Sequence, residues 1–89
     1  MAIEFDAAKD AANIAKHGIS LARAEDLEVL YFLADERADY GEVRYRAWGT
    51  IDGQSYCLAF TRRGGVVRVI SLRRAHAKEM KRNVPQGDF

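Results

Sequence analysis

Apolar residues in the first third of the chain recur every three to four positions, which is typical of helices that bury one face. Asp6 is a good N-cap for a helix over residues 7–17, and Gly18 stands where a left-handed C-cap is usual. Ser20 can cap a second helix over residues 21–30. The apolar positions are Ala7, Ala11, Ile14 and Ala15 in the first helix and Leu21, Ala24, Leu27 and Tyr31 in the second.

The period of the pattern changes to two after a polar loop at residues 36–41. Three strands are predicted, over residues 43–51, 55–61 and 66–72, joined by turns at Asp52-Gly53 and Arg63-Gly64-Gly65. The last of them is a nearly continuous β-branched run, as expected for a central strand buried on both faces.

A final helix is predicted from about residue 74 to residue 82, because the residue before Pro85 disfavours helix. Residues 83–89 are expected to form a flexible tail. With a short extended stretch at residues 3–5, the order is β-α-α-β-β-β-α. We predict a single α+β domain over residues 1–89, with an antiparallel sheet of three or four strands, two N-terminal helices on one face and the C-terminal helix on part of the other.

Composition supports one folded domain, because the 89 residues include 48 % hydrophobic residues. The single cysteine, Cys57, excludes an internal disulfide, and no apolar run is long enough to span a membrane. The N-terminus lacks the basic-then-apolar order of a signal peptide. We therefore expect a cytoplasmic protein with no membrane association.

The net charge of +1 hides an asymmetry between the two parts of the chain. Residues 1–61 carry six Lys and Arg against eleven Asp and Glu, whereas residues 62–89 carry eight against two. This split is consistent with a polyanion site on the C-terminal part, but also with a solvated basic helix balanced by an acidic one. Charge alone leaves both interpretations open.

The sequence contains no recognisable metal site or phosphate-binding loop. His17, His76 and Cys57 lack metal-ligand spacing, and Gly64-Gly65 belongs to a predicted turn. No cofactor is expected. What remains is a set of Arg, Lys, His and Glu residues near strand and helix ends, which suits chemistry on phosphate because cations stabilise the charge of the transition state.

Two pairs of arginines are candidates for RNA or phosphate contacts. Arg44 and Arg46 share a strand face with Trp48, whose ring could stack on a base or could instead pack under the C-terminal helix. Arg73 and Arg74 lead into the predicted last helix, where a bound phosphate would favour cations at a helix N-terminus. The alternative is that these two pair with acidic side chains such as Glu42 or those of the acidic helix.

Three further residues have both a structural and a catalytic interpretation. Lys16 and His17 lie in the last turn of the first helix, where positive charge suits the helix dipole, and a histidine can also act as acid or base. Glu42 begins the arginine-bearing strand, as an ion-pair partner or as a general base. Spacing does not decide between these roles.

The order of several short motifs resembles the BrnT family of toxins. The resemblance covers residues 3–79 and includes Lys9, Asn13, Lys16-His17-Gly18-Ile19-Ser20, Tyr40-Gly41-Glu42-Val43-Arg44, Gly49, Asp52-Gly53, Thr61, Arg68-Val69-Ile70-Ser71-Leu72-Arg73-Arg74-Ala75 and Glu79. Arg82, Asn83 and Val84 stand where family members often have tyrosines, and Leu72 where a small residue is usual.

The resemblance implies a RelE-like fold and a metal-independent ribonuclease that blocks translation. It also implies an antitoxin of the BrnA type, whose ribbon-helix-helix part binds operator DNA, and we expect a complex with two toxins per antitoxin dimer. By motif position, the functional residues would be Lys16, His17, Glu42, Arg44, Arg68 and Arg73.

Two functions follow from these residues. In the first, RNA is cleaved by attack of the ribose 2′-hydroxyl, with Arg44 and Arg73 as the phosphate clamp, Glu42 or His17 as base or acid, and Lys16 as an electrostatic aid. Arg46, Trp48, Arg68 and Arg74 would then bind the RNA. In the second, the same surface binds nucleic acid or a protein without catalysis.

Overall fold

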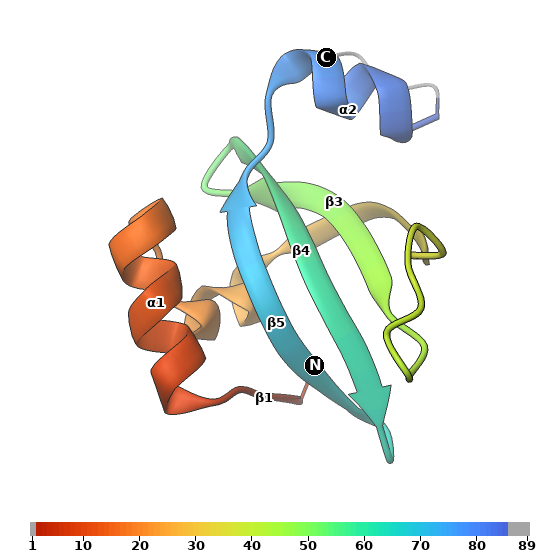
Figure 1. The fold of residues 1–89 in the computed structure, drawn as a ribbon. Helices are drawn as coiled ribbons and strands as arrows, with labels where there is room; N and C mark the ends of the chain where they lie inside the picture. The colour runs from red at the N-terminus through yellow and green to blue at the C-terminus, as the bar shows by residue number, and fades with distance from the viewer. Residues whose placement is uncertain (1, 86–89) are drawn as a thin grey trace.

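The computed structural model describes residues 2–85, which form a five-stranded mixed sheet with helices at its margins (Figure 1). The strand order is β1-β5-β4-β3-β2, with β1 parallel to β5 and every other pair antiparallel. The strands are β1 (Ile3–Glu4), β2 (Glu28–Ala34), β3 (Tyr45–Ile51), β4 (Gln54–Arg63) and β5 (Val66–Arg74). The helical elements are α1 (Ala7–His17), the 3₁₀ helix η1 (Leu21–Asp26) and α2 (Ala77–Asn83).

The predicted caps of α1 are confirmed, but its predicted apolar stripe is not buried. The Asp6 carboxylate accepts a hydrogen bond from the Lys9 amide at 3.0 Å, and Gly18 has φ = 73°. The helix lies beside β5 rather than across the sheet (Figure 1), and Ile14 is 46 % exposed. Within α1, Asn13 alone is buried.

Asn13 explains why α1 takes this position. Its side-chain amide donates to the Leu72 carbonyl at 2.9 Å, and its carbonyl oxygen accepts from the Leu72 amide at 3.2 Å. β1 pairs with β5 only at residues 67 and 68, so the edge of β5 beyond them would otherwise present unpaired backbone groups. Asn13 thus supplies the contacts of a neighbouring strand.

The prediction of a second long helix is wrong. Of the predicted helix over residues 21–30, only residues 21–26 are helical. Residues 28–34 form β2, which pairs with β3. A register shift between Val29 and Tyr31 marks a bulge at Leu30. Because of this extra residue, the two side chains of β2 that point to the same side, Val29 and Phe32, are three positions apart instead of two. The alternation typical of a strand is therefore hidden in the sequence. The predicted sheet of three or four antiparallel strands is therefore a mixed sheet of five.

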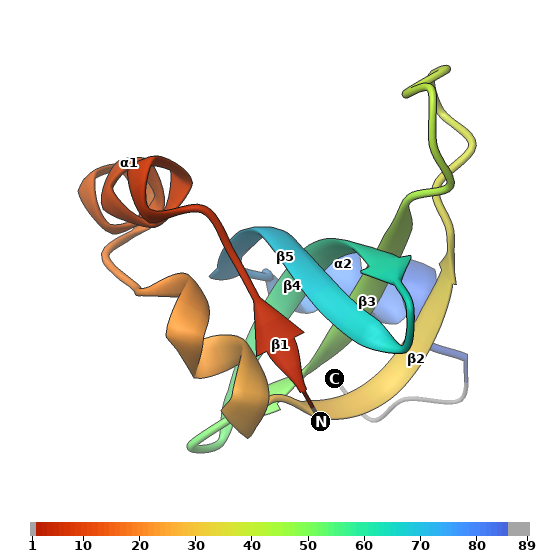
Figure 2. The same ribbon diagram turned by 90° about the horizontal axis from the view of Figure 1, so that it is seen from below.

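Each face of the sheet has its own apolar core. On the first face, Leu21 and Ala24 of η1 and Leu27 just beyond it form a cluster with Leu58 and Phe60. On the second face, Met80 of α2 and Val84 just beyond it cover Trp48 and Cys57, with Tyr31 and Leu33 packed alongside. η1 and α2 therefore lie on opposite sides of the sheet (Figure 2).

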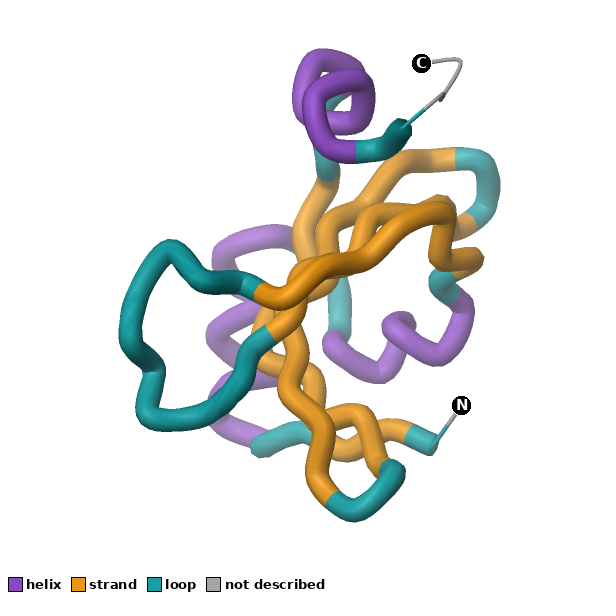
Figure 3. Tube along the Cα trace, turned by 90° about the vertical axis from the view of Figure 1, so that its right-hand side faces the viewer, coloured by secondary structure: helices purple, strands orange, loops and turns teal. Residues whose placement is uncertain are grey.

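The last helix begins at Ala77 instead of residue 74, so Arg73 and Arg74 end β5. The tail does not begin at residue 83, because Asn83 is helical and Val84 is 6 % exposed. The rest of the predicted tail, residues 86–89, lies outside the described residues. The long connection between β2 and β3 extends away from the strands (Figure 3). No helix among residues 2–85 is long and apolar enough to cross a membrane.

Candidate active site on the α2 face of the sheet

Strand alternation directs most of the predicted cations to one face of the sheet, the face that α2 partly covers. Arg46 lies on the side of Trp48, with the Arg46 guanidinium carbon 5.0 Å from the centre of the indole ring. Arg73 reaches Glu79 of α2 and so points to this same side. Arg74 points the other way, because its guanidinium lies 5.6 Å from the ring of Tyr56, which packs against the η1 core.

Trp48 is a core residue and offers no exposed ring face. It is 0 % exposed, and its indole N–H donates to Glu79 Oε2 at 3.0 Å. In this structure Trp48 packs under the last helix, which is the second of the two interpretations given by the sequence, and its ring has no open face on which a base could stack. The reason is α2, which brings Met80 and Val84 onto the ring.

Arg73 is tied to α2. Its two terminal nitrogens donate to the two Glu79 carboxylate oxygens at 2.8 and 2.9 Å. These bonds, with burial opposing them, hold the pKa of Glu79 at about 2. Arg73 therefore does pair with an acidic side chain. Its partner is Glu79, however, and not Glu42 or the acidic helix, which the sequence analysis named as alternatives. A bidentate pair occupies both terminal nitrogens, so Arg73 is first of all the residue that anchors α2 to β5.

Arg44 and Arg46 are the least satisfied cations of the face. The Nε atoms of both are buried and make no hydrogen bond within residues 2–85. Their nearest carboxylate contacts are long, 3.7 Å from Arg44 Nε to Glu42 and 4.0 Å from Arg46 Nε to Asp35. The Arg46 side chain is 19 % exposed. Partly buried guanidinium groups without hydrogen bonds are suited to accept an anion.

Asp35 and Arg37 belong to this cluster, although the sequence analysis did not single them out. Asp35 is buried and accepts two hydrogen bonds of 2.7 Å from the Arg37 side chain and one of 3.1 Å from the Tyr40 hydroxyl. The hydrogen bonds from Arg37 place the pKa of Asp35 far below its usual range. The Asp-x-Arg spacing in a polar loop was the available signal, but such pairs are common on solvated loops.

Lys16 and His17 border a hollow of about 280 Å³ between α1 and β5, which Ser71 also lines. Partial burial, then the charges of Lys16 and Arg73, lower the pKa of His17 below 6.5. The imidazole is therefore mainly neutral at pH 7 and can take up a proton. The structure thus brings the charge of Arg73 near Lys16 and His17, from which it is far removed in the chain.

Other predicted site residues lie apart from this group. Arg68 pairs with Glu4 of β1 at 3.6 Å, five positions before Arg73 along β5. Arg74 donates to the Gln54 side chain at 3.0 Å on the opposite side. Glu42 lies between Arg44 and Arg63, 3.4 Å from the latter. No group of three or more His, Cys, Asp and Glu side chains in the described part of the chain is placed to hold a metal ion.

Comparison with known proteins identifies one family. A family model described as the ribonuclease toxin, BrnT, of type II toxin–antitoxin systems matches residues 5–79. These residues include α1, all of the antiparallel strands and Glu79. No curated protein shows significant similarity to the chain.

Proposed function

The chain belongs to the BrnT family of ribonuclease toxins of type II toxin–antitoxin systems, and we propose that it cleaves RNA without a metal by attack of the ribose 2′-hydroxyl. The observation that carries this proposal is the position of His17, which lines the hollow between α1 and β5 beside Lys16, at the margin of the face that holds Arg44 and Arg46. An RNA backbone laid across this face would meet both a proton acceptor and anion-binding groups.

In the proposed reaction, His17 removes the proton of the 2′-hydroxyl, and the 2′-oxygen then attacks the adjacent phosphorus. The bond from phosphorus to the 5′-oxygen breaks, and that oxygen takes a proton from water. Lys16 stabilises its developing charge, while Arg44 and Arg46 hold the non-bridging oxygens. General acid–base assistance contributes about 10²–10⁴-fold to such a rate.

We assign the base to His17 rather than to Glu42, because the two Glu42 carboxylate oxygens face the guanidinium groups of Arg63, at 3.4 Å, and Arg44, at 3.7 Å. Arg73 acts chiefly as a positioning residue. Its pair with Glu79 fixes α2, and its charge helps to keep His17 neutral. Arg37 holds Asp35 and thereby leaves Arg46 without a close counter-ion. Arg68 and Arg74 would contact RNA away from the reacting phosphate.

The cellular part of the proposal follows from the family. We propose that the toxin acts in the cytoplasm, that cleavage blocks translation, and that the partner is a BrnA-like ribbon-helix-helix antitoxin. The complex would contain two toxins per antitoxin dimer and would bind operator DNA through the antitoxin. Inducing the chain alone should arrest growth, and adding the antitoxin gene should restore it. Normal growth with soluble toxin present would contradict the proposal.

The direct test is cleavage of RNA by the antitoxin-free toxin in the presence of a chelator. Removing one charge contact that strengthens in the transition state costs on the order of 10²–10³ in rate, so Arg46→Ala should lose about that much. Arg46→Lys should recover only part, because an ammonium cannot make the two-point contact of a guanidinium. Arg74→Ala is the matched control, since Arg74 is exposed on the other side.

Equal small losses in Arg46→Ala and Arg74→Ala would show a diffuse basic surface instead of a site. Thermal melting of the same variants separates loss of activity from loss of fold. Binding of RNA without cleavage by the wild type would favour the second candidate, a non-catalytic binding module. One observation favours that candidate, namely the engagement of Arg73 by Glu79 instead of by an open site.

A further inference from the structure

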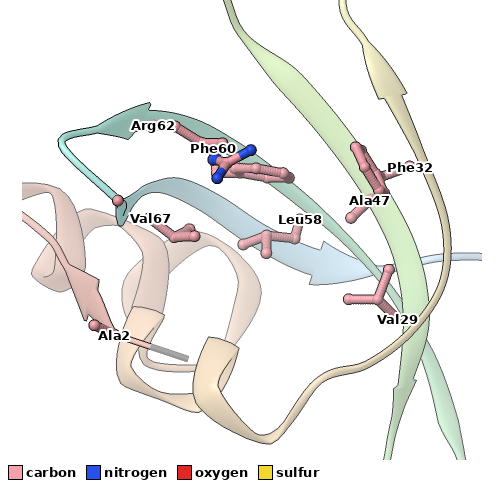
Figure 4. A pocket seen from close by; sticks show the side chains of 9 residues that line it. Ala2, Val29, Phe32, Ala47, Leu58, Phe60, Arg62 and Val67 are labelled. Carbon is pink, nitrogen blue, oxygen red and sulfur yellow. The ribbon is translucent and has the colours of Figure 1, made fainter.

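The face of the sheet opposite the candidate site is only half covered. η1 packs on one part of it, but residues 28–34 form β2 and so do not extend that cover. What remains open is a cleft of about 380 Å³ between β1 and β2. Seven apolar residues line it: Ala2, Val29, Phe32, Ala47, Leu58, Phe60 and Val67 (Figure 4).

The rim of this cleft is exposed and apolar on the β2 side. Phe32 is 56 % exposed and Val29 43 % exposed, and both point over the cleft in Figure 4. β2 is also one of the two edge strands of the sheet. Sheets in small domains are normally covered by a second layer of secondary structure, so an open apolar face of this kind indicates a missing layer.

The cleft has one charged side chain in its lining. Arg62 lines it on β4, close to the hairpin turn with β5, and within residues 2–85 it has no ion-pair partner. A segment lying in the cleft would therefore be favoured if it carried an acidic residue toward Arg62.

We propose that this cleft is the docking site of an amphipathic helix of the antitoxin, whose apolar side chains fill the space between η1 and β2. The proposal rests on the assignment of the chain to a toxin–antitoxin system, and it places the neutralising contact on the face away from His17 and Arg46. The helix completes the missing layer, with two or three large apolar side chains over Leu58 and Phe60 and an acidic residue at Arg62.

Binding of purified antitoxin to toxin variants tests the proposal. Phe32→Glu should weaken the affinity at least about 30-fold, the effect expected of an apolar anchor at an interface. Arg62→Glu should weaken it by a smaller factor, with recovery when the facing acidic residue of the antitoxin is reversed. Ile14→Glu is the matched control, because Ile14 is an apolar residue on α1, 46 % exposed, and outside the cleft.

The RNA cleavage of free toxin separates this proposal from the proposed function. Phe32→Glu should cleave like the wild type, because Phe32 lies on the opposite face from the candidate site, and it should escape neutralisation. Wild-type affinity in both Phe32→Glu and Arg62→Glu would overturn the docking site while leaving the ribonuclease intact. Loss of a toxin homodimer in Phe32→Glu, with antitoxin affinity unchanged, would instead show that the cleft receives a second copy of the chain.

Discussion

Replacing Glu79 by glutamine tests the ion pair that joins α2 to the sheet. The Glu79 side chain is 11 % exposed and accepts three hydrogen bonds, two from Arg73 and one from Trp48. A carboxyl group whose pKa falls from 4.5 to about 2 on folding contributes roughly 3 kcal/mol to stability at neutral pH. The Arg73 side chain is 38 % exposed, so solvent screening reduces the loss expected for the variant to about 2 kcal/mol.

The sign of the pH dependence follows from the lowered pKa of Glu79. The contribution is complete above the ordinary carboxyl pKa of 4.5 and is lost as the pH falls toward 2. Urea unfolding at pH 7 and at pH 3 should therefore show a smaller difference for Glu79→Gln than for the wild type. Some acid lability should remain, because hydrogen bonds from Arg37 lower the pKa of Asp35 as well.

Glu25→Gln is the control for Glu79→Gln, because Glu25 is exposed and forms no ion pair within the described residues. A loss of about 2 kcal/mol corresponds to a melting temperature lower by roughly 8–16 °C in a domain of this size. Unchanged stability at pH 7 together with wild-type acid lability would refute the reasoning. It would mean that Arg73 and Glu79 are separated in solution and that Arg73 is available for phosphate.

Three other changes test the site and the fold. The rate of RNA cleavage should fall as the pH drops below the pKa of His17, which lies under 6.5, and a profile that is flat from pH 7 to pH 5 would exclude His17 as the base. Asn13→Ala should lower the free energy of unfolding by about 2 kcal/mol, because it leaves buried backbone groups of Leu72 unpaired. Hydrogen exchange of the Leu72 amide should then accelerate, and slow exchange in the variant would contradict this role of Asn13. Gly49→Ala should destabilise the protein strongly, since the added Cβ would lie 2.1 Å from the Glu28 carbonyl oxygen; a wild-type melting temperature would argue against the pairing of β2 with β3.

The C-terminal part of the fold could be predicted because its signals are local. Strict alternation specifies β3 and β4, and Asp52-Gly53 specifies the turn between them, where both residues have positive φ. The caps of α1 are likewise short-range hydrogen bonds between neighbours in the chain. Motif order also sufficed to recognise the family, which the match over residues 5–79 confirms.

Features that depend on contacts between distant segments could not be predicted in the same way. The strand β2 forms because β3 offers an open edge, and the bulge at Leu30 conceals the period of two. The position of α1 depends on Asn13 reaching Leu72, 59 residues later in the chain. Both contacts are long-range, and their stabilisation outweighs the local preference for helix over residues 27–30.

The candidate site also combines features that the sequence predicts with features that only the tertiary structure decides. The sequence by itself identified the residue types, since a set of Arg, Lys and His near element ends suits phosphate, and it left two roles open for each. Tertiary structure decided among them: α2 buries Trp48 and engages Arg73, while strand alternation separates Arg74 from Arg46. The physical reason is that a side chain's charge and shape are local properties, whereas its solvation and its counter-ion depend on which segments the fold brings beside it.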